Sequence, residues 1–335
     1  MVILSGYRRK RAHTMTTATT LEIVAPGELA LSALGFDASI LAGGCSASTI
    51  AMYRRDFVAY LTFAGSAEQA LRSESLAQWR AHLAEQTTLS PNTINRMISA
   101  VKRMVREAAT QGYCASETAA QFEQVAGVKV KALKSRQKQG ARTAIKPDDM
   151  RRICEAPNLA TMPGKMHRAL LATLATSGLR ISEAVSLTPA QIEYGQDDDG
   201  RFGYYVWVMG KNETEPSKRP LGKEAHTLIK QWLAARSAAG VESAYIFTGF
   251  GGRGGREPRT TPIAPASAWE IVQRYAKACN LTHIKPHDFR RFVGTRLAKQ
   301  DIRLAQKALG HKRIETTAKH YVMDDLSLGQ TDNLY

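Results

Sequence analysis

Residues 284–321 constrain the fold most, because they carry start and stop signals for successive helices. Pro286 suits the first turn of a helix, where its missing N–H costs nothing, and Asp288 complements the positive helix end. Phe289, Val293 and Leu297 then recur every four residues and define a buried side. The segment therefore predicts a helix that starts near Pro286.

A second helix is predicted from Ile302 to Leu309. Asp301 precedes it as an N-terminal cap, and Gly310 suits the left-handed residue that ends it. His311 then lies just past the turn, and a third segment carries Tyr321.

The polar residues of this stretch predict a phosphate-handling site. His287 and Arg290 are three residues apart, so they share one helix face and can act on the same chemical group. His311 and Tyr321 follow on the next two segments.

An arginine turn lies about a hundred residues upstream. A helix is expected from Lys165 to Thr176, and Gly178 has the backbone freedom to turn the chain and deliver Arg180 to the helix Ile181 to Leu187. Glu183 lies three residues after Arg180 and is placed to hold its guanidinium. On its own, such a pair is typical of a surface ion pair.

Composition indicates a nucleic-acid partner. The chain has 335 residues, enough for two domains, and a formal charge of +16 with a pI near 9.8. A membrane surface is the rival polyanion, but no apolar run approaches the ~20 residues of a spanning helix. The sequence therefore predicts a protein without a membrane partner.

The cysteines indicate a reducing compartment. They are scattered and form no CxxC pair, which fits reduced thiols better than disulfides or zinc: Cys45, Cys114, Cys154 and Cys279. We expect a cytoplasmic protein, encoded by a bacterium or a phage and associated with the nucleoid.

The first residues predict a flexible basic tail over 1–20. They contain Arg8, Arg9 and Arg11 but no apolar core of a secretory signal. The tail is either disordered or an arm that touches DNA phosphates, and Met15 is an alternative start to Met1.

A small helical domain is expected over 21–128. The stretch 46–64 has Ser48 as a possible cap, and further helices are expected over 76–83 and 94–108.

Basic residues of this half form a candidate phosphate track, although exposed basic side chains are most often solvated surface. An interdomain linker over 129–146 is rich in lysine and arginine and contains no acidic residue. The candidate DNA contacts are Arg54, Arg55, Arg96, Arg103, Lys134, Arg136 and Lys138.

The second domain is expected over 147–325, followed by a tail over 326–335. Strand-like segments at 192–194, 204–209 and 219–221 predict a small antiparallel sheet.

A further buried strand is expected over 244–247. Residues 249–254 match the dinucleotide pattern GxGxxG, but prolines follow where a helix would have to open. We interpret them as a surface loop that runs to about Ala266.

His287-x-x-Arg290, Leu309-Gly310-His311 and Tyr321 resemble the second half of the tyrosine recombinases, the phage integrase and Xer group. Ser177 to Glu183 resembles the Gly-Leu-Arg turn of the same family. The resemblance implies a helical core-binding (SAM-like) domain that clamps DNA and a mainly α catalytic domain with a small antiparallel sheet.

By this resemblance, Tyr321 attacks the DNA phosphate and forms a 3′-phosphotyrosyl link, without metal or high-energy cofactor. Arg180 and Arg290 bind the non-bridging oxygens, and Glu183 supports Arg180.

His311 donates a further hydrogen bond to the phosphate, and His287 takes the tyrosine proton or orients the phosphate. Lys211 is the candidate acid for the leaving oxygen, with Lys218 as its rival. The interval from His311 to Tyr321 is one residue longer than the commonest family spacing.

The resemblance also implies double-stranded DNA with specific recombination sites, a homotetramer on DNA and, in some systems, accessory DNA-bending proteins. Two other functions stay open. One is a DNA-binding or architectural protein with a vestigial site, and the other is a relaxing enzyme like the type IB topoisomerases.

Two alternatives concern the site itself. Tyr335 is a second candidate nucleophile, in a predicted tail. His287, His311 and His320 are candidate metal ligands, but the two arginines would repel a cation and no carboxylate or cysteine cluster accompanies them.

Overall fold

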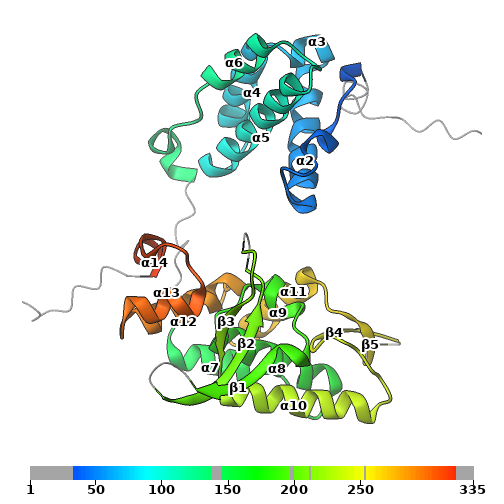
Figure 1. Cartoon of the computed structure of the whole chain (residues 1–335), viewed down its shortest axis with the longest axis vertical. Helices are drawn as coiled ribbons and strands as arrows, with labels where there is room; N and C mark the ends of the chain where they lie inside the picture. The colour runs from blue at the N-terminus through cyan, green and yellow to red at the C-terminus, as the bar shows by residue number, and fades with distance from the viewer. Residues whose placement is uncertain (1–32, 137–144, 197–199, 211–212, 253, 322–335) are drawn as a thin grey trace, which may run out of the picture. The chain divides into compact units, whose positions relative to one another are not determined.

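The computed structural model describes residues 33–136, 145–196, 200–210, 213–252 and 254–321, and the chain divides into two compact units, 1–139 and 140–335 (Figure 1). The first unit is helical, and the second is mainly helical with small antiparallel sheets. The predicted fold class is therefore confirmed. Among the residues described, no helix is long and apolar enough to cross a bilayer.

The first unit is built around α5 (Pro91–Thr110), which contacts helices on several sides. Its other elements are η1 (Ala38–Leu41), α2 (Ala47–Ala64), α3 (Ala67–Ala70), α4 (Ser73–Gln86), α6 (Ser116–Gln124) and η2 (Val130–Arg136). Apolar residues recur on one side of α5 and pack against Phe57 of α2, Trp79 of α4 and Phe122 of α6. This core is separate from that of the second unit.

Serine caps set the starts of the two longest helices of this unit. The Oγ of Ser90 accepts the N–H of Thr93 at 3.3 Å, and Pro91 fills the first helical position. The Oγ of Ser46 likewise accepts the N–H of Thr49 at 3.3 Å. The prediction that Ser48 caps α2 was wrong. Ser46 is the cap, and Ser48 lies in the first turn of the helix.

The residues after α6 are held against the first unit by Asn95. Its Oδ1 accepts the N–H of Val128 at 2.7 Å and its Nδ2 donates to the carbonyl of Val128 at 3.0 Å. Within the segment predicted to be a linker, η2 forms and Leu133 packs against the core of the first unit. The segments 1–20 and 326–335 lie outside the described residues.

The second unit is centred on α8 (Met162–Ser177), which contacts α7, α9, α10, α12 and β3. Leu170, Leu171 and Leu174 of this helix are fully buried. The other helices are α7 (Pro147–Glu155), α9 (Ile181–Val185), η3 (Pro189–Gln191), α10 (Lys223–Ala238), α11 (Pro265–Ala278), α12 (Pro286–Ala298), α13 (Ile302–Leu309) and α14 (Ile314–Tyr321).

The larger sheet is antiparallel, as predicted, with the order β1 (Ile192–Gln196), β2 (Phe202–Val208), β3 (Ser217–Leu221). Val206 of β2 pairs with Ile192 on one side and with Arg219 on the other. Because side chains alternate along a strand, Val206, Val208, Arg219 and Leu221 share the buried face.

The strand expected over 244–247 was wrong. The Nε1 of Trp232 donates to the carbonyl of Ile246 at 2.7 Å, and Nη1 of Arg236 donates to that of Tyr245 at 2.6 Å. Side chains of α10 thus bind backbone groups that a strand would have offered to a neighbouring strand.

The loop expected from residue 249 to Ala266 was also wrong. β4 (Thr248–Gly251) and β5 (Glu257–Pro262) form an antiparallel hairpin in which Phe250 pairs with Pro258 and Thr248 with Pro262. Both strands are edges of a two-stranded sheet, where proline is tolerated because a backbone N–H that faces away from the partner strand forms no ladder bond.

One buried carboxylate gives a test of the first unit. Asp56 on α2 is 3% exposed and is paired with Nη1 of Arg96 on α5, which is 33% exposed. We expect Arg96→Met to lower the free energy of unfolding by on the order of 2 kcal/mol, because it leaves a buried charge without its main partner. Urea denaturation followed by circular dichroism measures the change.

The matched control is Arg55→Met, because Arg55 also approaches Asp56, at 3.9 Å, but is 73% exposed. It should shift the free energy of unfolding by less than about 0.5 kcal/mol. Equal effects of the two substitutions would show that the Arg96 pair contributes no more than surface charge.

Candidate active site

α12 buries Arg290 inside the second unit. Pro286 occupies the first turn and the Oδ2 of Asp288 accepts the N–H of Lys285 at 2.8 Å, so the helix starts where the sequence predicts. Arg290 is only 2% exposed. Its Nη1 donates to the carbonyl of Gly178 at 2.8 Å and its Nη2 donates to the carbonyl of Leu309 at 2.6 Å. This guanidinium therefore joins the ends of α8 and α13.

α13 and α14 bring His311 and Tyr321 to the same place. Gly310 ends α13 in the left-handed conformation, with φ of +64°, as predicted. The Nε2 of His311 lies 3.3 Å from Nη2 of Arg290, and its Nδ1 lies 2.9 Å from the Oγ1 of Thr317. The rings of His311 and Tyr321 stack with centroids 5.4 Å apart and planes 27° apart. The longer interval between these residues does not separate their rings.

Gly294 in the middle of α12 makes room for the tyrosine. A Cβ at this position would lie 2.4 Å from Cδ1 of Tyr321 and 2.8 Å from Cδ1 of Leu309. Glycine costs helix stability relative to alanine, so a sterically required glycine has a packing reason here. The periodicity that predicted α12 gave no indication of this role.

Arg180 reaches the same region from the end of α8. Gly178 has φ of +64°, and Arg180 takes the N-cap position of α9. Its backbone N–H donates to Oε2 of Glu183 at 2.8 Å, and its Nη1 lies 2.6 Å from Oε1. Glu183 is 7% exposed and Arg180 is 35% exposed. Glu183 therefore fixes a guanidinium that is still open to solvent.

The charges of these groups act on one another. Burial lowers the pKa of Arg290, the neighbouring Arg180 lowers it further, and Tyr321 and Glu183 oppose the shift. Partial removal from water lowers the pKa of His287, and the positive charges of Arg291 and Arg290 add to this effect. At neutral pH the imidazole of His287 is therefore uncharged and able to accept a proton.

Of the two candidate lysines, Lys218 is among the described residues and Lys211 is not. Lys218 pairs with Trp207 on the sheet face opposite to the buried one, and its Nζ lies 5.0 Å from the Trp207 ring centroid and 3.9 Å from Oε1 of Glu193. Lys211, the first choice, lies outside the described residues.

Sequence reasoning missed Arg219 of β3. It is 2% exposed, and its Nη2 lies 3.4 Å from Oε1 of Glu213. Its charge acts with those of Arg180 and Glu183, so it belongs to the same electrostatic cluster. The available sequence signal was the period of two along the predicted strand, which puts Arg219 on the same face as the apolar Leu221.

Comparison with known families agrees with this arrangement. A model of the phage integrase family matches residues 143–326, more than half of the chain. The chain belongs to the phage integrase family. A model of the phage integrase N-terminal SAM-like domain matches residues 36–112 of this family member, within its first unit.

Curated relatives of this integrase-family chain are named tyrosine recombinases. XerD of Neisseria meningitidis is 31% identical over 180 residues, covering 52% of this chain and 56% of the relative. XerC of Yersinia pestis is 31% identical over 163 residues, covering 47% and 48%. These matches span about half of each relative's length. XerD of Listeria monocytogenes is 26% identical over 290 residues, covering 83% and 89%.

Solved structures share the fold. XerH bound to difH in a pre-cleavage complex has a TM-score of 0.59 at 16% identity, covering 89% of this chain and 82% of that chain. A lambda integrase dimer bound to a COC′ core site has a TM-score of 0.56 at 16% identity, covering 87% and 94%. At this identity the likeness concerns the fold alone.

The candidate DNA contacts of this family member lie in the first unit and differ in their surroundings. Arg54, Arg55 and Lys134 are exposed. Arg96 is held by Asp56, and Nη2 of Arg103 lies 3.2 Å from Oε2 of Glu107. Arg136 is half-buried, and Lys138 lies outside the described residues.

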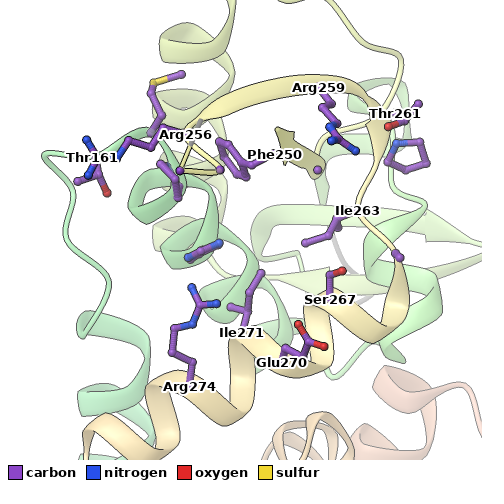
Figure 2. A pocket seen from close by; sticks show the side chains of 18 residues that line it. Thr161, Phe250, Arg256, Arg259, Thr261, Ile263, Ser267, Glu270, Ile271 and Arg274 are labelled. Atoms are coloured by element: carbon purple, nitrogen blue, oxygen red, sulfur yellow. The ribbon is translucent and has the colours of Figure 1, made fainter. Parts of the chain in front are cut away.

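A large cavity of the second unit lies apart from the candidate site. It has a volume of about 880 Å³ and is lined by none of the described residues predicted for catalysis. Figure 2 shows Ser267, Glu270 and Arg274 of α11 on one side, and Phe250 and Arg259 of the β4–β5 hairpin on the other. The cavity is therefore not the place where Arg290 and Tyr321 meet.

The two candidate phosphate-binding arginines should differ in their effect on stability. Arg290→Ala should lower the free energy of unfolding by about 2–4 kcal/mol, because two buried carbonyls lose a charged donor. Arg180→Ala should cost about 1 kcal/mol, because Glu183 loses its ion pair with a partly exposed guanidinium but keeps its hydrogen bond from the backbone N–H of residue 180. Urea denaturation of both variants at pH 7 measures the difference, and a larger loss for Arg180→Ala would contradict the structural role of Arg290.

Proposed function

We propose that this chain is a site-specific tyrosine recombinase that cleaves and rejoins DNA through a 3′-phosphotyrosyl intermediate. The observation that carries the proposal is the meeting of three side chains beside Arg180: Arg290 of α12, His311 of the turn after α13 and Tyr321 of α14. The family membership and the names of the curated relatives support the reaction class.

The reaction is a pair of transesterifications. The hydroxyl oxygen of Tyr321 attacks the phosphorus, its proton leaves, and the bond from phosphorus to the 5′ oxygen of the DNA breaks. The phosphotyrosyl bond keeps the energy of the broken diester, so religation needs no cofactor. Arg180 and Arg290 neutralise the charge that grows on the non-bridging oxygens, where loss of one such donor typically costs ~10²–10³ in rate.

Two groups handle protons in this proposal. His287, neutral at pH 7 because its pKa is lowered, accepts the proton of Tyr321 directly or orients the phosphate. His311 donates a hydrogen bond to the phosphate, and Lys211 protonates the 5′ oxygen as it leaves.

The substrate of this proposal is double-stranded DNA with specific recombination sites. The helical domain over 21–128 clamps the duplex with Arg54 and Arg55 among its contacts. The basic segment 129–146, which contains Lys134, links it to the catalytic domain, 147–325. The excess of positive charge supports a polyanionic partner. Homotetramer assembly on DNA, accessory DNA-bending proteins and a cytoplasmic location complete the proposal.

Replacing the nucleophile tests the function. Tyr321→Phe should abolish the covalent complex with a radiolabelled nicked suicide substrate, because the hydroxyl that attacks the phosphorus is lost. Tyr335→Phe is the control and should retain the complex. Denaturing gel electrophoresis after protease digestion separates the species. A covalent complex in Tyr321→Phe would refute the assignment, and relaxation of plasmids that lack any specific site would indicate a topoisomerase instead.

The proton acceptor predicts an acid limit of activity. Cleavage should stay constant from pH 8 to about 6.5 and fall only as the pH drops through the lowered pKa of His287. Arg291→Gln removes the positive charge that lowers the pKa of His287 most, so this pKa rises and the rate should begin to fall at a higher pH. Single-turnover rates between pH 5 and 8 measure the shift.

The control for this shift is Arg296→Gln, an exposed arginine on the same helix. It should leave the acid limit of the cleavage rate in place. An unchanged or lower limit in Arg291→Gln would mean that another group titrates.

A further inference from the structure

We infer that Arg219 is a positioning residue that holds the Gly310–His311 turn against β3 and, through Glu213, both flanks of the β2–β3 connection. The effect on catalysis rests on the proposed function, but the positioning itself does not.

The location of Arg219 is unusual for an arginine. It lies on the buried face of the sheet beside Val206, Val208 and Leu221, each nearly inaccessible to solvent. Burying a guanidinium is costly unless it is paired, so its partners show what this residue holds in place.

The first partner is Glu213. Nη2 of Arg219 lies 3.4 Å from Oε1 of Glu213, while Oε2 accepts the N–H of Gly210 at 3.1 Å and the hydroxyl of Ser217 at 2.7 Å. One carboxylate thus contacts residues on both sides of 211–212, and Nη1 of Arg219 adds a bond to the carbonyl of Lys218 at 3.0 Å. Burial alone would raise the pKa of Glu213, but Ser217 and Arg219 lower it, so the carboxylate is charged.

The second partner is the backbone before His311. A Cβ built on Gly310 would lie 1.8 Å from Nη2 and 2.3 Å from Cζ of Arg219, so the guanidinium packs directly on this glycine. The contact joins β3 to the end of α13, two elements that lie against each other (Figure 1). Among the described residues, Nε of Arg219 is buried without a hydrogen-bond partner, so packing rather than a full set of bonds holds this edge.

The position of the turn determines the position of His311. The imidazole must stay within 3.3 Å of Arg290 and stack on Tyr321, and it follows Gly310 directly. A shift of about 1 Å in such a group can cost 10²-fold in rate. Arg219 therefore acts on the reaction through the turn, without touching the substrate.

The test compares Arg219→Met with Arg236→Met. Arg236 is also buried and its Nη1 and Nη2 donate to backbone carbonyls, but those belong to residues 243–246. Hydrogen–deuterium exchange of the native full-length chain and both variants is followed in peptides that contain Gly310 and His311, whose amides bond to carbonyls of α13. Arg219→Met should speed exchange there about 10-fold or more, and Arg236→Met should leave it unchanged.

Catalysis provides the second readout. At equal occupancy of DNA, Arg219→Met should form the covalent complex 10- to 100-fold more slowly, with DNA affinity within about twofold of native. Glu213→Gln/Arg219→Met removes both charges of the pair, so it should regain stability but not rate. Arg219→Lys keeps the charge near Glu213 without the flat group that packs on Gly310, and should recover the melting temperature more than the rate.

Unchanged exchange at Gly310 and His311 in Arg219→Met would overturn the inference, as would equal acceleration by Arg236→Met. A rate of covalent-complex formation within twofold of native would overturn the catalytic part. If the native chain forms no covalent complex, the proposed function fails instead, while the exchange experiment still decides the role of Arg219.

Discussion

The candidate site depends on one buried guanidinium that joins two helix ends and also lies beside two candidate catalytic residues. Arg290 donates to the carbonyls of Gly178 and Leu309, which end two helices far apart in the sequence, and its Nη2 also lies near His311. Carbonyls at helix ends have no partner within their own helix, so a buried cation satisfies them. These two hydrogen bonds also fix the orientation of the Arg290 guanidinium, whose positive charge acts on Tyr321.

Helix termini deliver most of the other groups. Arg180 is the N-cap of α9, His287 lies in the first turn of α12, and His311 follows the end of α13. Backbone geometry is most sharply defined at such points, because a cap and a left-handed glycine each permit one exit direction. Side chains of different helices can therefore meet within hydrogen-bonding distance without a long loop.

Sequence patterns predicted much of this arrangement and missed identifiable parts. Pro286, Asp301 and Gly310 marked helix ends correctly, because each acts through local backbone chemistry. The prediction of a strand at 244–247 failed because Trp232 and Arg236, on the helix before it, bind its carbonyls with their side chains. The β4–β5 hairpin was missed because its prolines usually exclude strands, and Gly294 and Arg219 were missed because their roles depend on contacts between elements.

The packing of Arg219 on Gly310 also limits how this sequence can change. A larger residue at 310 would occupy the volume of the guanidinium, and a smaller residue at 219 would leave a gap beside the turn. A change at either position alone would therefore leave a clash or a gap at this contact. A sequence with a large residue at 310 would need a smaller residue at 219. Residues 219 and 310, although 91 positions apart, are therefore expected to change together.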